Sequence, residues 1–376
     1  MTVTQDLPLI DHHCHGLLAY DIPHDEFRVL ATESDWLGPE GTETLDSPFG
    51  LAVRRLCAPL LGLERHTPIE EYLARRTELG HEAVHRALMP GTGTGRFIID
   101  SGFRASAVME PEEMATATGT PADEIVRIET IAEAVAEETD AGGFTAEFRT
   151  RIREAARTAV GFKSIVAYRF GFDLAAEAPS EGEVRRALDG WYARDGQHGR
   201  WRIDDPVLLQ HLLWETVALQ MPIQLHVGYG DSDVSLFRAD PSRLTDFLSA
   251  TRTSGATFML LHCYPFVREA AILAQVFPHV YFDVGLVSHY TGPSVITSLR
   301  EALEITPFSK LLYSSDAYGL AEHYVVSSHL WRAGVGRILD EWIADDWVSG
   351  ADAERFARMM AGGNAERAYG LTPAVS

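Results

Sequence analysis

The chain has 376 residues, of which 46% are hydrophobic and 23% are charged; this composition is typical of a globular protein with a buried core and excludes collagen, coiled coil and disorder. Acidic residues outnumber basic ones by 54 to 32, a formal charge of −22, which argues against nucleic acid and anionic membranes as partners. The sequence shows neither an apolar run of membrane-spanning length nor a signal peptide, so we expect a cytoplasmic protein.

Short apolar runs and longer periodic stretches alternate along the whole chain, which is the pattern of an α/β fold. A first strand at residues 7–11 precedes a helical insertion at about residues 27–90. The later predicted strands are residues 96–100, 124–128, 160–164, 222–226, 257–262, 280–283 and 310–315. The main helices that follow the insertion are predicted at residues 145–158, 183–191, 206–219, 241–251, 265–277, 295–303, 322–344 and 351–369.

Eight parallel strands with interleaved helices specify a (β/α)8 TIM barrel, here with an insertion after strand one and extra C-terminal helices. Because no linker rich in Pro, Gly or Ser divides the sequence, we predict a single barrel domain over residues 1–376. The densest glycine cluster, GTGTG at residues 91–95, precedes a strand rather than following one. It is therefore read as a loop, since a phosphate-binding loop should follow a strand and open a helix.

Three cysteines, Cys14, Cys57 and Cys263, form an odd number without the spacing of a metal finger. In a protein expected to be cytoplasmic, such cysteines are predicted to be reduced thiols. Cys14 and Cys263 stand beside histidines, but a buried apolar thiol is the simpler explanation, and neither is assigned to a metal.

The first strand leads into Asp-His-His-Cys-His-Gly, residues 11–16. Alternation along a strand places His13 and His15 on one face, about 7 Å apart along the backbone, and Cys14 on the other face. Two imidazoles so placed could converge on one cation, and imidazole is a favoured ligand of zinc. Taken alone, the pair could equally be a polar strand end satisfied by hydrogen bonds.

Further residues with metal-binding chemistry fall at or near the ends of other predicted strands. His226 and His262 end strands five and six, Asp316 directly follows strand eight, and Lys163 lies in strand four. In a barrel the carboxyl ends of all strands open on one face, where catalytic groups gather. The sequence therefore predicts a metal site at that face, built from these residues together with the histidines of strand one.

These positions resemble the amidohydrolase superfamily of metal-dependent hydrolases, with its His-x-His on strand one, Lys on strand four, His on strands five and six, and Asp on strand eight. A narrower resemblance is to the branch that forms the amidohydrolase-like half of nodulin and glutamine-synthetase fusion proteins. That narrower resemblance is carried by the segments GFKSIVAYRFG, QLHVGYGDSD, LLHCYPFVREAA, VYFDVGL and KLLYSSDAYG.

The resemblance implies a divalent metal, with zinc favoured, bound as one or two ions. His13, His15 and His226 would be metal ligands. Asp316 would also contact the metal, accept a proton from the activated water and deliver it to the leaving group.

Metal count would depend on two residues. A carbamylated Lys163 would bridge two metals, whereas in a mononuclear site His262 would polarise the substrate. His262 is therefore both a candidate ligand and a candidate catalytic residue. As an alternative to bridging, Lys163 could be a buried ion-pair partner of Asp316.

Three residues are candidates for substrate binding. Tyr168 and Arg169 follow strand four, and the planar donors of an arginine could fork to a substrate carboxylate. The alternative is that Arg169 binds Glu177 or another neighbouring acid. His289 follows strand seven and could face the same site.

We therefore expect a metal-dependent amidohydrolase that cleaves an amide or other C–N bond of a small carboxylate-bearing molecule. The alternative is that the chain is a metal-dependent non-oxidative decarboxylase, since relatives with a single metal carry out that reaction with much the same ligands. From a different class, the chain could be a regulatory or scaffold module related to the fusion proteins. Size suggests a homodimer.

Overall fold

The computed structural model describes residues 3–36, 38–102, 107–196 and 198–372. Helices and parallel strands alternate along these ranges, so the predicted α/β class, with strands in barrel order, is confirmed. The chain forms two compact units, each described here by itself. Unit 1 comprises residues 1–123, 230–232 and 283–376, and unit 2 comprises residues 124–229 and 233–282.

Unit 1 contains the two strands β1 (Leu9–Cys14) and β2 (Thr94–Asp100), which pair in parallel. All six residues of β1 are buried, as is expected for a parallel strand covered on both faces. The predicted strand at residues 7–11 is thus shifted toward its C-terminus. This shift places His12 and His13 inside the strand and His15 just beyond its end.

The predicted eighth strand lies beside β1 but is not a regular strand. The backbone N–H of His12 donates to the carbonyl of Tyr313, that of Asp316 donates to His13, and that of His15 donates to Ala317. Asp316 has a φ of 50°, in the left-handed region. Few residues other than glycine adopt that region, and it turns the chain out of a continuous ladder at this point.

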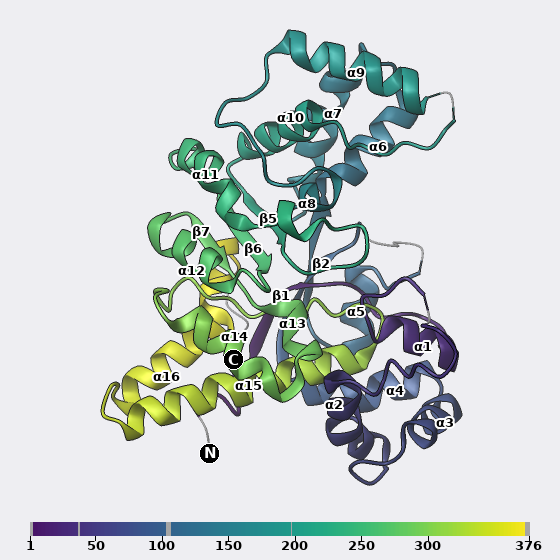
Figure 1. The fold of residues 1–376 in the computed structure, drawn as a ribbon, viewed down its shortest axis with the longest axis vertical. Helices are drawn as coiled ribbons and strands as arrows, with labels where there is room; N and C mark the ends of the chain where they lie inside the picture. The colour runs from purple at the N-terminus through teal and green to yellow at the C-terminus, as the bar shows by residue number, and fades with distance from the viewer. Residues whose placement is uncertain (1–2, 37, 103–106, 197, 373–376) are drawn as a thin grey trace. The chain divides into compact units, whose positions relative to one another are not determined.

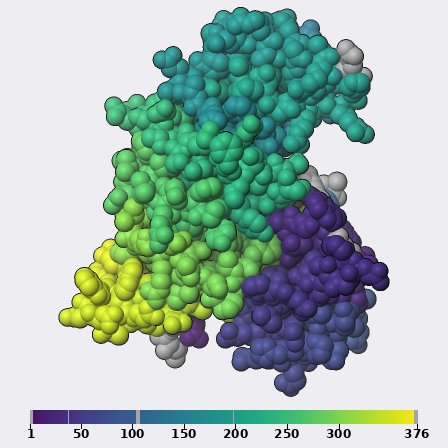
Figure 2. Space-filling view, in the orientation of Figure 1, coloured from purple at the N-terminus to yellow at the C-terminus, as the bar shows by residue number. Residues whose placement is uncertain are grey.

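The insertion after β1 is helical, as predicted. Its helices α1 (His24–Leu30), α2 (Pro48–Leu56), α3 (Ile69–Leu79) and α4 (His81–Leu88) share one core with α15 (Ala321–Ala344). Residues 40–90 form a continuous part of the surface of unit 1 in Figure 2. Ser47 caps α2 by accepting a hydrogen bond from the backbone N–H of Gly50, and proline at the first position fixes the start of that helix.

The remaining helices of unit 1 are α5 (Pro111–Thr118), α13 (Gly285–Tyr290), α14 (Val295–Leu303), α16 (Gly350–Arg358) and α17 (Asn364–Tyr369). A short π-helical segment, Met359–Gly363, joins α16 to α17. Helix α15 packs against α2, α4, α13 and α14 (Figure 1). None of the helices in the described residues has the length and apolar character needed to cross a membrane.

Unit 2 carries the later strands, β4 (Gly161–Ser164), β5 (Pro222–Val227), β6 (Thr257–His262) and β7 (Val280–Phe282), each parallel to the next. Strand β3 (Ala122–Arg127) pairs with β4 through its residues 125–127. It ends one residue earlier than predicted, because Ile128 already belongs to a helix and is buried in its first turn.

The helices of unit 2 follow its strands. They are α6 (Ile128–Glu138), α7 (Phe144–Ala155), α8 (Val166–Arg169), α9 (Glu181–Asp195), α10 (Pro206–Val217), α11 (Thr245–Thr251) and α12 (Val267–Val276). Helix α9 begins at a capping box in which Ser180 and Glu183 satisfy each other's backbone N–H groups.

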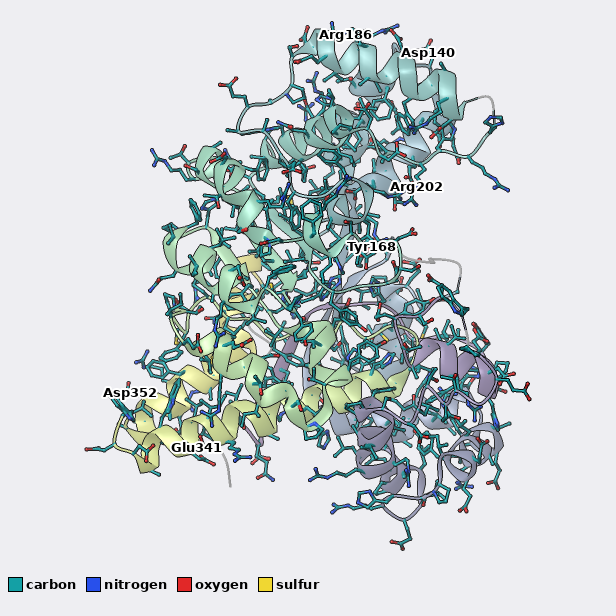
Figure 3. The ribbon with its side chains drawn as sticks, in the orientation of Figure 1. Asp140, Tyr168, Arg186, Arg202, Glu341 and Asp352 are labelled. Atoms are coloured by element: carbon teal, nitrogen blue, oxygen red, sulfur yellow. The ribbon has the colours of Figure 1, made fainter. Side chains whose placement is uncertain are left out.

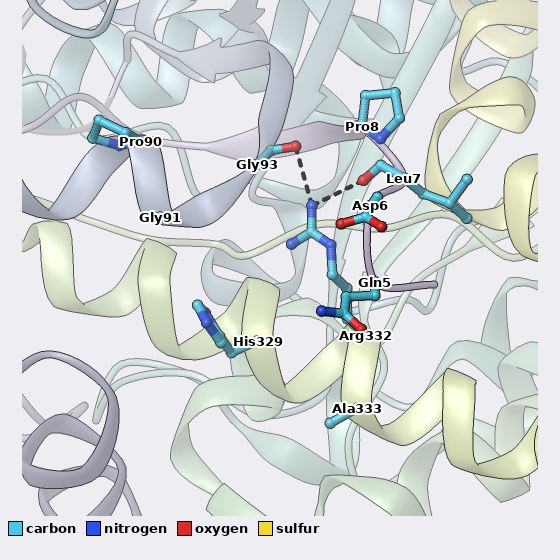
Figure 4. A pocket seen from close by; sticks show the side chains of 10 residues that line it. All are labelled: Gln5, Asp6, Leu7, Pro8, Pro90, Gly91, Gly93, His329, Arg332 and Ala333. Carbon is cyan, nitrogen blue, oxygen red and sulfur yellow. Dashed lines mark hydrogen bonds between the residues drawn. The ribbon is translucent and has the colours of Figure 1, made fainter. Parts of the chain in front are cut away.

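Unit 1 has a cavity of about 670 Å³ (Figure 4). The guanidinium of Arg332 donates to the carbonyls of Leu7 and Gly93 there, just before β1 and β2 begin. The cavity therefore lies at the amino ends of these strands, where barrel residues serve stability. Gly93, from the glycine cluster, has a φ of 59° and lines this end. The interpretation of the whole cluster as a loop is wrong, because Met89–Thr92 form a 3-10 helix and Thr94 already begins β2.

Candidate metal centre

Unit 1 brings together three of the residues predicted to bind metal. One donor atom each from His13, His15 and Asp316 lies within 4.8 Å of the other two. Nε2 of His13 is 2.9 Å from Oδ1 of Asp316, and Nε2 of His15 is 3.5 Å from the same oxygen. Two imidazole nitrogens and a carboxylate oxygen so arranged are a donor set that suits zinc or another borderline divalent cation.

The tautomer of His15 is fixed by its second ring nitrogen. Nδ1 of His15 lies 3.0 Å from the backbone carbonyl of Asp100 at the end of β2. A carbonyl oxygen only accepts, so Nδ1 carries the proton and Nε2 presents its lone pair toward the Asp316 side. Histidine ligands of metals are commonly oriented in this way, so the residues present fit a metal ion.

His12, which directly precedes His13 in sequence, belongs to a different network. Its Nε2 lies 2.9 Å from Oδ2 of Asp283, and its Nδ1 lies 3.0 Å from the hydroxyl of Tyr369. The thiol of Cys14 points to the carbonyl of Ile98. Strand alternation therefore separates His13 from His12 and, as predicted, from Cys14. The three cysteines are free and buried, which agrees with reduced thiols.

Asp11 holds the segment that carries Asp316. Its Oδ1 accepts a hydrogen bond from the backbone N–H of Ser315 at 2.8 Å, and its Oδ2 lies 2.5 Å from the Ser315 hydroxyl. The Ser315 hydroxyl in turn accepts from the N–H of Ala317. Burial raises the pKa of Asp11 to about 8, the hydrogen bonds from Ser315 oppose that rise, and the charge of Asp316 adds to it.

Other ionisable groups of unit 1 feel the charge of Asp316. Burial raises the pKa of Glu33 to about 8, with a contribution from Asp316 and an opposing hydrogen bond from Tyr290. Burial lowers the pKa of His323 to about 4. The ring of His323 stacks on His289, with 4.5 Å between ring centroids. The substrate-binding candidate His289 is thus buried, and it also contacts Phe49.

Unit 2 holds the other candidates. Lys163 on β4, His226 on β5 and His262 at the end of β6 are 2%, 4% and 1% exposed, respectively. The rings of His226 and His262 lie 4.6 Å apart. His262 has a φ of 69°, and a non-glycine residue in that region is a strain that often marks functional sites.

The two substrate-binding candidates of unit 2 have defined neighbours. The ring of Tyr168 lies 4.5 Å from the ring of His226. Nη2 of Arg169 lies 3.1 Å from Oε1 of Glu133 on α6. The acid that pairs with Arg169 is therefore Glu133, which agrees with the alternative of a neighbouring acid, although the acid is not Glu177.

Sequence reasoning missed several residues that support the centre. Asp11 belongs to the strand-one motif but was given no role from the sequence, although an acid two residues before His13 was a usable signal. Tyr324, whose hydroxyl donates to the carbonyl of His15, carries no local signal, because only the folded chain brings it to the end of β1.

The comparisons with known proteins agree with this geometry. The sequence model of the amidohydrolase family (Amidohydro_2) matches residues 10–371. The chain belongs to the amidohydrolase family. Membership in the superfamily, predicted from six positions, is thereby confirmed.

Among known proteins, the chain is similar to Protein fluG of Emericella nidulans, with 26% identity over 413 residues. The match covers 98% of this chain and 46% of fluG, so the chain spans about half the length of that relative. This agrees with the resemblance to one half of a longer protein.

Two solved structures are similar over nearly the whole chain. A candidate metal-dependent hydrolase from Lactobacillus casei ATCC 334 has a TM-score of 0.84 and 27% identity, and the match covers 98% of this chain and 96% of that one. A uronate isomerase from Bacillus halodurans C-125 has a TM-score of 0.66 and 14% identity, with 98% and 95% covered. At that identity, the isomerase shows a shared fold only.

Proposed function

We propose that this chain is a metal-dependent hydrolase that cleaves an amide or other C–N bond of a small carboxylate-bearing substrate. The observation that carries the proposal is the convergence of His13, His15 and Asp316, two imidazoles and a carboxylate, in a chain of the amidohydrolase family. The L. casei structure, described as a candidate metal-dependent hydrolase, supports the same reaction class.

In this proposal His13 and His15 hold a divalent cation, for which zinc is our choice. Lys163, His226 and His262 are proposed as metal ligands because the family pattern has ligands at these positions. A bound divalent cation lowers the pKa of water and polarises a substrate carbonyl. Hydrolysis further requires a group that moves a proton between the attacking water and the leaving nitrogen.

Asp316 is that group. Its Oδ1 lies 2.9 Å from Nε2 of His13 and 3.5 Å from Nε2 of His15. One carboxylate oxygen therefore faces both candidate ligands. A carboxylate at this position can serve as a base, and once protonated it can return the proton to the leaving amine. Asp11, through Ser315, keeps the backbone of Asp316 in place for both steps.

Metal analysis of protein purified without added metal tests the site. His13→Ala and His15→Ala should each contain much less metal than the wild type and should not turn over substrate. His24→Ala is the matched control, since His24 lies on α1 and pairs with the hydroxyl of Thr77. Wild-type metal content in both His13→Ala and His15→Ala would contradict the proposed centre.

The reaction is tested by assays for released ammonia, amine and carbon dioxide across a panel of carboxylated amides and aromatic acids. Release of ammonia or amine supports C–N hydrolysis. Release of carbon dioxide alone would contradict hydrolysis and identify a decarboxylase. No turnover of any member by metal-loaded protein would favour a regulatory or scaffold role.

A further inference from the structure

The cavity of unit 1 at the amino ends of β1 and β2 has no part in the proposed reaction. Its volume of about 670 Å³ is in the range of sites that take small molecules. Residues 5–8, residues 90–93 and the middle of α15 surround it (Figure 4). A parallel strand rises about 3.3 Å per residue, so Pro8 lies roughly 16 Å along the chain from His13. The cavity is therefore a separate place from the candidate metal centre.

The guanidinium of Arg332 lines the cavity, but its edge is already engaged. Nη1 donates to the carbonyl of Thr92 at 2.6 Å and to that of Ser328 at 3.5 Å. Nη2 donates to the carbonyls of Leu7 and Gly93, each at 3.0 Å. Nε is buried from solvent and makes no hydrogen bond within the described residues. What Arg332 offers a ligand is therefore its charge and its planar face, which is turned toward the viewer in Figure 4.

The glycine cluster makes this arrangement possible. Gly93 has a φ of 59°, and a Cβ at this position would lie 2.6 Å from Nη2 of Arg332. A side chain at residue 93 would thus displace the guanidinium from the carbonyls that hold it. The glycine fixes the plane of Arg332 at the wall of the cavity.

The charges at the cavity balance. Burial lowers the pKa of Arg332, and the charge of Asp6 opposes that change. Partial burial lowers the pKa of His329, so its ring is neutral at pH 7. An anion would meet the carboxylate of Asp6 and no accessible donor of Arg332, whereas a cation would be repelled by the guanidinium. The cavity therefore favours a neutral ligand, although the chain has a net charge of −22.

The other polar groups of the cavity include two acceptors. Nδ1 of His329 lies 3.0 Å from the carbonyl of Val325. Because a carbonyl only accepts, Nδ1 carries the proton and Nε2 keeps a lone pair. The carboxylate of Asp6 also only accepts, and within the described residues it has no hydrogen bond or ion pair. Asp6 and His329 lie on opposite sides of the Arg332 guanidinium in Figure 4, so a ligand with N–H donors at its edge would match them.

We infer that this cavity is a second binding site, which takes a neutral, planar heteroaromatic molecule with N–H donors at its edge. The ring lies on the face of Arg332, because a guanidinium stacks favourably on an aromatic ring. Its N–H groups donate to Asp6 and to Nε2 of His329. Pro8 and Pro90 line the same cavity and supply apolar contact. The inference is independent of the proposed hydrolysis.

Calorimetric titration of the full chain with adenine tests the site, because adenine combines a planar ring with an exocyclic amine and a ring N–H. The control ligands are purine, which lacks the amine, benzoate, which is a planar anion, and cyclohexylamine, which is a cation without an aromatic face. Adenine should bind about tenfold more tightly than purine, since it makes one more hydrogen bond to a charged group. Benzoate and cyclohexylamine should not compete with adenine. Chelation of bound metal should leave the affinity for adenine unchanged.

Three variants locate the binding. Asp6→Asn should weaken adenine binding by about tenfold, because it removes a charged acceptor. His329→Phe keeps a flat ring without Nε2 and should weaken binding by a smaller factor, since a neutral acceptor contributes less. Arg332→Met should abolish the stacking and most of the affinity. Asp352→Asn, at an exposed acid on α16 that Figure 3 labels, is the matched control and should bind adenine as the wild type does.

Absence of adenine binding by the wild type would overturn the inference, and so would equal affinity in wild type, Asp6→Asn and His329→Phe. Purine or benzoate binding as tight as that of adenine would overturn the ligand class. Loss of adenine binding after chelation would place adenine on the metal and overturn its assignment to this cavity. If Arg332→Met does not fold, because it also loses the carbonyl contacts, Asp6→Asn decides, since the side chain of Asp6 is exposed.

Discussion

A buried ion pair between the helical insertion and α15 gives the most quantitative prediction. Nε of Arg76 on α3 lies 2.9 Å from Oε1 of Glu322 on α15, and the side chains are 4% and 0% exposed. The hydroxyl of Tyr72 donates to the same oxygen at 2.7 Å. Arg76→Met keeps an apolar stem of similar length and removes the charge, so it isolates the pairing from the packing.

The expected cost follows from burial. Glu322 in the variant is a fully buried carboxylate that keeps only the hydroxyl of Tyr72 as a side-chain donor. Removing one partner of such a pair costs about 3–5 kcal/mol. The double variant Arg76→Met/Glu322→Met should recover most of the lost free energy of unfolding, because replacing both charges by apolar groups is often close to neutral. Arg86→Met breaks the exposed pair with Glu82 and should leave stability unchanged.

The cost should depend on pH with a defined sign. Burial raises the pKa of Glu322, but the charge of Arg76 and the hydrogen bonds of Tyr72 and Arg76 outweigh it and hold that pKa below its ordinary value of 4.5. In the wild type this stabilisation is therefore complete above about pH 4.5 and is lost as pH falls through the folded-state pKa. Without Arg76, burial raises the pKa, so the penalty is largest at high pH and is relieved as the carboxyl takes up a proton.

Urea unfolding of wild type and variants at pH 8 and pH 5 measures both effects. The gap in unfolding free energy between wild type and Arg76→Met should be widest at pH 8 and narrower at pH 5. Cys57 and His85 also feel Glu322, and burial holds the pKa of His85 at about 4, so His85 is neutral at both pH values. A variant as stable as the wild type at pH 8, or a gap that widens at pH 5, would refute the reasoning.

Further outcomes are expected at the candidate centre. Asp316→Asn should keep the fold and most of the metal but lose turnover by several orders of magnitude, because an amide cannot carry the proton; near-normal turnover would remove Asp316 from the mechanism. If Lys163 is a carbamylated bridge, Lys163→Ala should lower the bound metal from two ions toward one. The bridge would be rejected if the wild type holds a single ion and the variant retains it. Gly16→Ala should lower the melting temperature and metal content together, since its Cβ would lie 2.0 Å from the carbonyl oxygen of Met109; an unchanged melting temperature would show that this backbone approach can relax.

The sequence by itself determined the fold class and indicated the residue types of the candidate site. Period-two and helical patterns are local, and an acid or histidine at the end of a buried strand is visible without tertiary information. Strand alternation alone separated His13 and His15 from Cys14, and the thiol of Cys14 does point elsewhere. The combination of strand-end ligands identified the family, because each position carries a separate chemical constraint.

Only the tertiary structure decided which side chains meet. Arg169 pairs with Glu133, a residue 36 positions away in the sequence (169 − 133). Arg76 pairs with Glu322, and the two residues lie on helices that are far apart in the sequence. Composition and periodicity cannot choose among 54 acids for a given arginine. The sequence also could not show that the eighth strand is irregular. The left-handed turn at Asp316 goes with two hydrogen bonds, one from the N–H of Asp316 to the carbonyl of His13 and one from the N–H of Ser315 to the carboxylate of Asp11. Those contacts depend on two segments some 300 residues apart, which local propensity does not encode.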